Sequence, residues 1–436
     1  QGVHTALGQM LAEELDADWD QLKLEEAPAI GEYAMYAAGR RYLLTGIDFP
    51  KLVIPTVDGM MMRVADTLNM QITGGSMSVR TTGILAMRTA GAATRQLLQQ
   101  AAAEAWDVPV EEIATEKSHL IHAASNRREP YASFAADVAE MTPSYTPSFK
   151  DPADYKIVGT HKPRRDIPAK VDGSLKFAMD VQLPNMLYAT VVRSPVPGGS
   201  VVELDDSVAR SVEGVVDVIV IPATTVSSML GDTVSAETVA VVADSYWSAS
   251  KGLKELKVQW SEVGFETVSS DGIFEQFNRD ISASAERQTD HVQGEASSVF
   301  AGAAKVVDAD YHVPFLAHTC MEPLNATADV RTDSAEIWVG CQNPLGFRRD
   351  IADSLGMDPE KVTLHNHSMG GGFGRKARPD WALQVAHLAR EVGRPVQLIW
   401  SREEDVRQDF YRPAVQSRFR AAFDAQDNLL AWENTY

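Results

Sequence analysis

The sequence predicts an α+β protein, and three observations lead to that class. The chain has 436 residues, 44% hydrophobic and 23% charged, which is typical of a soluble globular protein of about two to four domains. Helical periodicity dominates residues 4–15 and 82–105, whereas residues 156–260 contain short β-rich segments. Between residues 304 and 436, strand-like and helix-like segments alternate.

Within the first 145 residues, an apolar stripe of Leu7, Met10, Leu11 and Leu15 predicts a helix at residues 4–15. Residues 21–26 alternate in polarity, which predicts a strand. The alanine-rich segment 82–105 predicts a long helix, which ends before Pro109 because proline cannot continue a helix. Residues 143–155 contain several prolines and predict a linker.

The rest of the chain predicts further elements. Strands are expected at residues 187–193, 215–221, 239–243, 256–260, 361–367, 397–400, 416–423 and 429–436, and helices at 247–256 and 381–392. The strands at 397–400 and 416–423 are expected to form a pair. Residues 261–300 are polar without clear periodicity and predict a long connection. The resulting domains are residues 1–145, 146–265 and 266–436.

Composition excludes several classes of function. The net charge of −20 argues against a nucleic-acid partner, because nucleic-acid binding needs a basic face. No apolar run reaches the roughly 20 residues that span a bilayer. The two cysteines, Cys320 and Cys341, exclude a disulfide scaffold and an iron–sulfur cluster held within the chain, and both are expected to be buried free thiols.

The most informative motif is Gly370-Gly-Gly-Phe-Gly374, followed by Arg375 and Lys376. It lies between a predicted strand and a predicted helix. Glycine permits positive φ and close approach of the backbone to another group, so the motif favours a bend laid against a flat or anionic ligand. A tight turn is the alternative. The motif lacks the Gly-Lys-Ser/Thr ending of a phosphate-binding ATPase loop.

Three other loops share this character of small residues, backbone donors and an amide or hydroxyl next to a helix start. They are Gln1-Gly-Val-His-Thr5, Gly74-Gly-Ser-Met-Ser78 and Gly340-Cys-Gln-Asn-Pro344. Backbone N–H groups and hydroxyls at helix starts suit a phosphate, and Gln or Asn suits the edge of a heterocycle. Each loop alone is typical of a helix cap, but together they favour one shared binding site.

These motifs, in this order, resemble the molybdopterin-binding large subunit of the xanthine dehydrogenase and aldehyde oxidase family. Within that family the chain is similar to the branch of the isoquinoline 1-oxidoreductase beta subunits, because the Gln1-Gly2 loop precedes the Gly370–Gly374 loop. The resemblance covers essentially the whole chain. It also includes Thr73-Gly-Gly-Ser76, Met87-Arg-Thr-Ala-Gly-Ala92, Lys170-Val-Asp-Gly173, Arg193-Ser-Pro-Val196, His318-Thr-Cys-Met-Glu-Pro323, Gln342-Asn-Pro344 and Trp400-Ser-Arg-Glu-Glu-Asp405.

The resemblance implies molybdenum-cofactor-binding domains that flank a smaller α/β-hammerhead-like domain at residues 146–265. It implies a molybdopterin, in the cytosine dinucleotide form and carrying molybdenum, with no metal ligand supplied by this chain. The residues implied in binding are Gln1, Gly2, Gly75, Ser76, Ser78, Gln342, Gly371, Gly372, Phe373, Gly374 and Arg375. Gln342 and Phe373 are expected beside the metal, and Arg375 near a phosphate, with a solvated cation as the alternative for Arg375.

The implied reaction oxidises an N-heteroaromatic ring or an aldehyde, with water as the oxygen donor. Electrons are expected to leave through 2Fe-2S clusters of a separate small subunit, toward a cytochrome or quinone-linked acceptor. The family's general-base glutamate lies in a Gly-x-Gly-Glu loop that does not occur in residues 1–436, so we expect it beyond Tyr436 and expect this segment alone to be inactive. A bacterial protein that is periplasmic or membrane-associated is expected. The alternative is a non-catalytic homologue or a nucleotide-binding scaffold that retains the loops.

Other polar residues are expected to be structural. Glu322 and His318 are assigned supporting roles rather than ligation. His365 and His367 alternate along one predicted strand and face the same side, where a structural role is favoured over a metal site. The run from Arg402 to Asp405 is expected to form ion pairs.

Overall fold

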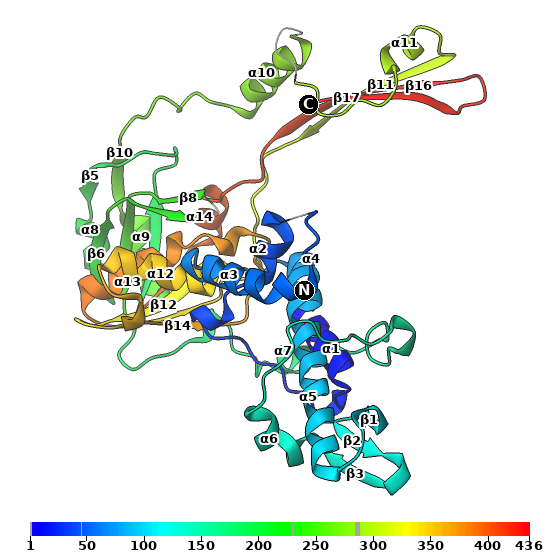
Figure 1. Cartoon of the computed structure of the whole chain (residues 1–436). Helices are drawn as coiled ribbons and strands as arrows, with labels where there is room; N and C mark the ends of the chain where they lie inside the picture. The colour runs from blue at the N-terminus through cyan, green and yellow to red at the C-terminus, as the bar shows by residue number, and fades with distance from the viewer. Residues whose placement is uncertain (1, 45, 229–230, 284–287) are drawn as a thin grey trace.

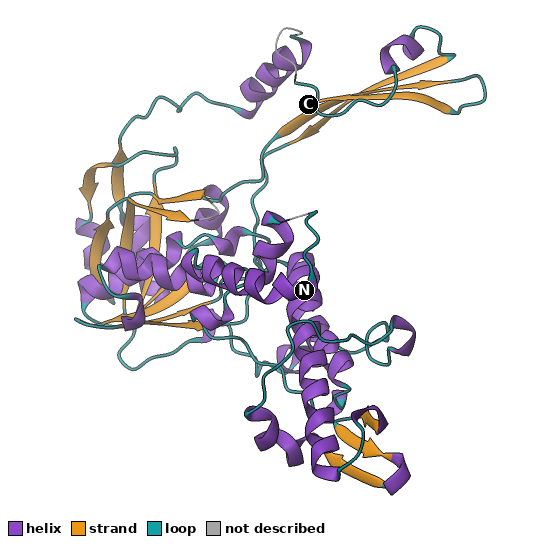
Figure 2. Cartoon of the chain, viewed as in Figure 1, coloured by secondary structure: helices purple, strands orange, loops and turns teal. Residues whose placement is uncertain are grey.

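A computed structural model describes residues 2–44, 46–228, 231–283 and 288–436. It confirms the mixed α+β class. Figures 1 and 2 show three parts: a helical region that contains the N-terminus, a body of helices packed on a large sheet, and an arm of long strands that ends at the C-terminus. No helix among the described residues is both long and apolar enough to cross a membrane.

The body is built on a seven-stranded sheet with the order β14-β13-β12-β15-β4-β9-β6. Its strands are β4 (Leu187–Arg193), β6 (Val215–Ile221), β9 (Thr238–Ala243), β12 (Asn325–Val330), β13 (Ala335–Val339), β14 (Val362–Asn366) and β15 (Val396–Ile399). Every residue of β9 is buried, as expected of a mostly apolar strand that has a neighbour on both sides in a covered sheet. The pairs β13–β14 and β15–β4 are parallel, and the other neighbours are antiparallel.

Two helices, α12 (Pro344–Leu355) and α13 (Asp380–Val392), supply the other half of the main core. Trp381 of α13 is fully buried, and its indole N–H donates to the Asn325 carbonyl at 3.0 Å. The same core joins Val242 of β9 to Ala326 of β12. The predicted domain boundary at residue 265 therefore does not separate two units, because segments from both sides of it share one sheet and one core.

The helical region comprises α1 (Val3–Leu15), α2 (Tyr36–Leu43), α3 (Ile54–Thr67), α4 (Gly75–Ser78), a π-helical segment (Val79–Met87) and α5 (Arg88–Trp106). The predicted helices at 4–15 and 82–105 are confirmed. Helices α1 and α5 pack closely because Gly91 has no side chain, and a Cβ there would lie 2.6 Å from the Leu11 carbonyl oxygen.

The predicted strand at residues 21–26 is wrong. Gln21 ends a short 3-10 turn (Trp19–Gln21), and residues 21–26 belong to no strand. Their alternating polarity instead places Leu22 and Leu24 on α1, where a Cβ at Gly8 would lie 3.2 Å and 2.8 Å from their methyl groups. The alternating polarity of this segment reflects the burial of one side of the chain against α1. The segment does not pair with a neighbouring strand, so it is not part of a sheet.

A small subdomain lies at the far end of α5. It contains β1 (Ile113–Glu116), β2 (His119–His122), β3 (Arg127–Pro130) and α6 (Ala135–Ala139). Leu98 of α5 packs with Leu120 and Phe134 in its core. Figure 1 shows this subdomain well away from the large sheet.

The remaining elements of the body are β5 (Val201–Asp205), α8 (Ser207–Ser211), β7 (Thr224–Ser228), β8 (Gly231–Ser235), α9 (Tyr246–Glu255), β10 (Lys257–Trp260) and α14 (Arg402–Arg407). Helix α7 (Ile167–Val171) follows a segment beside the start of α1, where the Arg165 N–H donates to the Thr5 hydroxyl. The helix predicted at 247–256 and the strand predicted at 256–260 are confirmed as α9 and β10.

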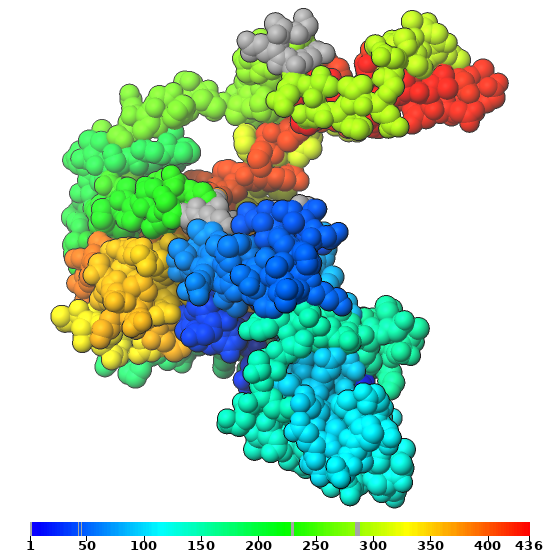
Figure 3. Space-filling view, viewed as in Figure 1, coloured from blue at the N-terminus to red at the C-terminus, as the bar shows by residue number. Residues whose placement is uncertain are grey.

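The arm is a three-stranded sheet, β11-β16-β17, made of β11 (Lys305–Val313), β16 (Val415–Phe423) and β17 (Leu429–Thr435). Figure 3 shows it projecting from the body on the face in view. The strands predicted at 397–400 and 416–423 both exist, but they lie in different sheets, so the expected pairing is wrong.

Residues 261–300 are not a plain connection, because they contain α10 (Ser270–Ser282) and α11 (Ala296–Phe300). Ser269 caps α10 by accepting from the Gly272 N–H at 3.2 Å. The ring of Phe274 stacks on His312 of β11 at 4.9 Å between centroids. The apolar spacing of Phe274, Phe277 and Ile281 is the helical signal that the polar composition concealed.

Candidate functional site

Two of the loops predicted to share a site, residues 340–343 and the glycine bend, meet at one edge of the large sheet. Strands β13 and β14 are parallel neighbours, so the segments that follow them leave the sheet at the same edge. Residues 340–343 follow β13, and the glycine bend, residues 370–376, lies downstream of β14. The two segments touch, since a Cβ at Gly340 would lie 3.2 Å from Met369.

Gln342 links three segments that are distant in the sequence. Its backbone N–H donates to the Lys376 carbonyl at 2.8 Å, and its carbonyl accepts from the Thr73 N–H at 2.7 Å. Its side-chain Oε1 accepts from the Gly374 N–H at 2.9 Å, and its Nε2 donates to the Thr73 carbonyl at 3.1 Å. Gln342 is 7% exposed, so these bonds form a buried junction between the helical region and the body.

The glycine bend has an unusual backbone. Gly371, Phe373 and Gly374 have positive φ angles of 110°, 52° and 108°. A phenylalanine in this region is strained, and its ring is left 68% exposed rather than packed in a core. Strain of this kind collects at functional sites, where the surrounding structure holds it in place.

The bend also presents unpaired backbone donors. Among the described residues, none accepts a hydrogen bond from the N–H groups of Gly371, Gly372 or Phe373. Successive N–H groups in a backbone of alternating φ sign form a concave nest that binds anions or oxygen atoms. The structure therefore shows a ready set of donors next to Gln342.

A buried ion cluster lies beneath the bend. The Arg375 guanidinium is 1% exposed, and it donates to both carboxylate oxygens of Asp380 at 2.8 Å. Its Nε lies 3.0 Å from Oδ1 of Asp409. Burial by itself raises the pKa of Asp380, but Arg375 and Arg193 beside it hold that pKa below its ordinary value.

The helical region contributes the segment that begins α4. Thr73, which binds Gln342, lies two residues before this helix. The Ser78 hydroxyl is 5% exposed and accepts from the Gly74 N–H at 3.1 Å, which closes the start of the helix on itself. Ser76 is exposed.

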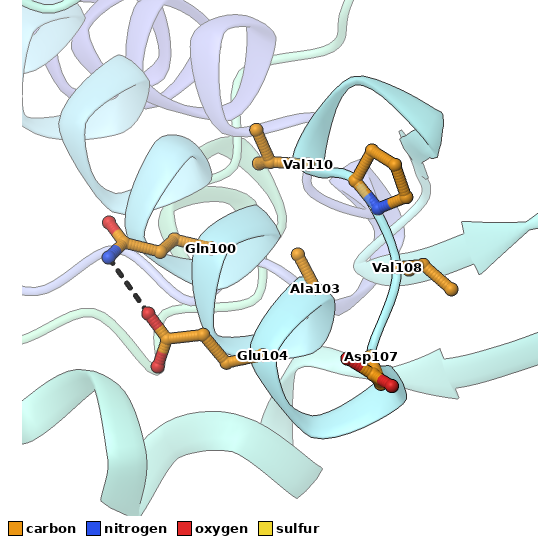
Figure 4. A pocket seen from close by; sticks show the side chains of 7 residues that line it. Gln100, Ala103, Glu104, Asp107, Val108 and Val110 are labelled. Carbon is orange, nitrogen blue, oxygen red and sulfur yellow. Dashed lines mark hydrogen bonds between the residues drawn. The ribbon is translucent and has the colours of Figure 1, made fainter.

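The lining of two surface hollows can be compared with the predicted site residues. One, of about 500 Å³, lies at the end of α5 and is lined by Gln100, Ala103, Glu104, Asp107, Val108, Pro109 and Val110 (Figure 4). It contains none of the predicted site residues. The other, of about 560 Å³, includes Asn343 and three aspartates. Burial, reinforced by nearby Asp353, raises the pKa of Asp350 in this hollow to about 7.

Comparison with known proteins shows what the chain is similar to. A family model described as a molybdopterin cofactor-binding domain matches residues 278–436. The chain is 31% identical to the beta subunit of isoquinoline 1-oxidoreductase from Brevundimonas diminuta, over 100% of this chain and 56% of that protein. It is 27% identical to a subunit of nicotinate dehydrogenase from Pseudomonas putida, over 93% of this chain and 30% of that protein.

Over its whole length the chain resembles a molybdopterin-binding large subunit of the xanthine dehydrogenase and aldehyde oxidase family, and residues 278–436 match the cofactor-binding domain itself. It is homologous to molybdopterin-binding large subunits of molybdenum-dependent oxidoreductases. The aldehyde oxidoreductase of Desulfovibrio gigas has a similar fold, with a TM-score of 0.50 and 20% identity over 98% of this chain and 44% of that one. The chain thus spans about half the length of the isoquinoline relative, and less of the others.

The residues at the junction fit a molybdopterin. The free N–H groups of Gly371, Gly372 and Phe373 can donate to oxygen atoms of such a group. An amide nitrogen carries two protons, and only one of those on Gln342 Nε2 is taken by Thr73. Gly372 leaves space for Gln342, because a Cβ there would lie 2.6 Å from Oε1.

The N-terminal loop is placed only in part. Gly2 precedes α1 with a φ of 76°, and a Cβ there would lie 3.6 Å from Arg164. Helix α1 also contacts α4, so this loop is on the side of the molecule that carries the Gly74–Ser78 motif. Gln1 lies outside the described residues, and its expected contact with the pterin stays a prediction.

One expectation for an individual residue is corrected, and a second residue is less accessible than expected. Arg375 is neither a phosphate contact nor a solvated cation, because its guanidinium is buried and engaged by Asp380 and Asp409. Ser78 is 5% exposed and its oxygen accepts from the Gly74 N–H, so Ser76 is the more exposed hydroxyl of that motif, and the expected phosphate contact of Ser78 stays a prediction. The burial of Arg375 was not visible from spacing, because Asp409 is brought to it by folding.

The supporting residues behave as expected. His318 Nδ1 lies 3.0 Å from Asp409, and Glu322 pairs with Lys376 at 2.6 Å. His365 lies 3.1 Å from Glu336.

The Arg402–Asp405 run also forms ion pairs, with Arg402 on Asp405 and Arg407 on Glu404, and both cysteines are free and buried. Sequence reasoning missed the buried Lys376, Asp380 and Asp409, of which only Asp380, at a helix start, had any local signal.

Proposed function

We propose that this chain is the cofactor-binding part of a molybdenum hydroxylase that oxidises an N-heteroaromatic ring or an aldehyde with water as the oxygen donor. The observation that carries the proposal is the row of unpaired N–H groups at Gly371, Gly372 and Phe373 beside Gln342. It lies where separate segments converge, in a chain of a family whose members bind molybdopterin.

The chain's own residues have distinct roles in this proposal. The bend donates hydrogen bonds through its backbone, and the free amide proton of Gln342 reaches an oxygen of the bound group. Ser76 and the start of α4 meet the phosphates of a cytosine dinucleotide tail. The exposed ring of Phe373 supplies an apolar surface for a planar or aliphatic substrate. When bound, the molybdenum cofactor supplies the redox chemistry and activates water.

Partners and location are part of the proposal. A small subunit with 2Fe-2S clusters receives the electrons and passes them toward a cytochrome or quinone-linked acceptor. The two enzymes named above are composed of subunits, which supports a multi-subunit enzyme here. We place the enzyme in the periplasm or at the membrane of a bacterium.

The test uses the full-length protein co-expressed with its iron–sulfur partner. Elemental analysis is expected to find molybdenum in the purified complex, and acid treatment is expected to release CMP. Turnover of isoquinoline and of a panel of aldehydes, with a dye as electron acceptor, separates the two substrate classes. A complex with no molybdenum contradicts the proposal. Bound molybdenum without turnover of any substrate favours the non-catalytic homologue instead.

A further inference from the structure

The glycine bend is closed at its base by one side chain. Glu322 Oε2 accepts from the Gly370 N–H at 2.8 Å and from Lys376 Nζ at 2.6 Å. In return, the Glu322 N–H donates to the Gly370 carbonyl at 3.0 Å. Residues at the two ends of the bend, Gly370 and Lys376, are thus held by a single carboxylate from another segment.

Glu322 and Lys376 together form a clip across the base of the bend, and this clip is buried and tightly packed. The side chains of Lys376 and Glu322 are 2% and 8% exposed. A Cβ at Gly370 would lie 2.4 Å from the Cβ of Glu322, so the backbone of the bend rests directly on that side chain. The clip therefore acts on the backbone of the bend and not only on a side chain.

Stability alone does not account for the clip. A buried ion pair loses hydration on folding, and an apolar pair of the same volume is often at least as stable. In addition, Glu322 Oε1 is buried and has no hydrogen-bond partner among the described residues. Burial by itself disfavours an unpaired carboxylate oxygen, so the arrangement indicates a role in conformation.

The bend needs such an external constraint. Gly371, Phe373 and Gly374 hold positive φ angles, and a strained backbone persists only where its surroundings fix it. The described hydrogen bonds and ion pairs that fix the bend from outside include the Gln342 bonds at Gly374 and Lys376, the Arg375 ion pairs and the Glu322 clip. The clip alone contacts both ends.

We propose that Glu322 and Lys376 are positioning residues that set the shape of the glycine bend and thereby aim its free N–H groups at the bound cofactor. The inference deepens the proposed function and rests on it for the identity of the ligand. The shape of the bend can also be measured without the ligand.

The test compares Lys376→Met with Lys150→Met in the full complex. Lys150 is a matched control, because it also pairs with a buried glutamate at 2.6 Å, in a part of the chain distant from the bend. Hydrogen exchange is followed in the peptide that spans residues 368–378, whose Gly374 and Arg375 amides are protected by the shape of the bend. Molybdenum per complex and the Mo(V) electron paramagnetic resonance spectrum are measured on the same samples.

We expect Lys376→Met to accelerate exchange in this peptide and to lower molybdenum content by about tenfold or more, as for other residues that support a metal site indirectly. Lys150→Met should leave both unchanged even where its melting temperature falls equally. Equal exchange in the two variants, or molybdenum loss that merely follows melting temperature, overturns the inference. A wild-type complex without molybdenum overturns the proposed function, while the exchange result still decides whether the clip shapes the bend.

A second variant guards against misfolding of the first. Glu322→Gln keeps an oxygen for the Gly370 N–H but removes the charge that pairs with Lys376. We expect this variant to bind molybdenum with an altered Mo(V) spectrum and faster exchange in the bend. A wild-type spectrum together with wild-type exchange overturns the inference.

Discussion

At the scale of single residues, the site depends on places where a side chain is absent and on charges that are buried. Gly370 and Gly372 allow the backbone to lie on Glu322 and Gln342 at distances that no Cβ tolerates. Arg375 carries its charge below the surface, where carboxylates surround it. The glycines act by leaving space for a neighbouring side chain, and Arg375 acts by compensating buried negative charge. Substitutions at these two kinds of position should therefore have different effects.

Gly370→Ala is expected to destabilise the protein by about 1–3 kcal/mol, because the new methyl group would lie 2.4 Å from the Glu322 Cβ and overpack a buried contact. Urea unfolding measures the effect. Gly59→Ala is the control, since it lies within α3 with no atom within 4 Å of the added Cβ. Alanine is favoured over glycine inside a helix, so this variant should be neutral or more stable. Equal loss in both variants contradicts the steric argument.

Glu404 predicts a pH dependence of stability. Burial raises its pKa from 4.5 to about 7, although the Arg193 N–H and the nearby charges of Arg193 and Arg407 oppose the rise. Between these two values the folded state holds a proton that the unfolded state has lost. The free energy of unfolding contributed by Glu404 therefore falls as pH rises from 4.5 to 7, by up to about 3 kcal/mol.

Glu404→Gln should remove this contribution, because an amide does not titrate and its oxygen can still accept from the Arg193 N–H. Denaturant unfolding at several pH values between 4.5 and 8 tests it. The variant is expected to gain stability relative to wild type as pH increases. A constant difference across that range argues against the raised pKa.

At the scale of elements, the sheet places the site and α13 supports the sheet. Parallel β13 and β14 bring the Gln342 loop and the glycine bend to one edge. Helix α13 begins just after the bend and covers the sheet with a face that is almost entirely buried. The position of the bend therefore depends on how well α13 packs.

Trp381→Ala is expected to destabilise the protein by about 3–5 kcal/mol, since the side chain is fully buried and its N–H is bonded to Asn325. Trp247→Ala serves as the comparison, because Trp247 is 68% exposed and its loss should change stability by less than about 0.5 kcal/mol. Thermal unfolding of both variants measures the difference. Similar melting temperatures for the two would contradict the assignment of the core to α13.

At the scale of the whole molecule, the helical region and the body are tied at the site. Thr73 and Gln71 come from the helical region, and they bind Gln342 and Asn343 of the body. A ligand held at this junction contacts segments of both parts. Binding should therefore stabilise the molecule as a unit, because a ligand that binds only the folded state shifts unfolding by mass action.

The complex isolated from cells unable to make molybdopterin is expected to melt at a lower temperature than the loaded complex. Limited proteolysis should then cut faster at residues 73–78 and 368–376 than in the loaded form. Cleavage in the β1–β3 subdomain, which is distant from the site, provides the internal control. Indistinguishable melting and cleavage of the two forms would show that no ligand bridges the junction.

Local physical chemistry made much of this protein readable from its sequence. The helix at residues 4–15 and the strand at 187–193 follow from periodicity, because a side chain's place on a helix or strand depends only on its neighbours in the chain. The glycine bend was readable for the same reason, since the permitted φ angles of glycine are a local property.

Only the tertiary structure decided which residues face the ligand and which support the site. Arg375 looks like a ligand contact in the sequence, yet folding buries it against Asp409. The clip between Glu322 and Lys376 joins segments that no local pattern connects. The physical reason is that hydrogen bonds and ion pairs act over a few ångströms in space, whatever the separation of their residues along the chain.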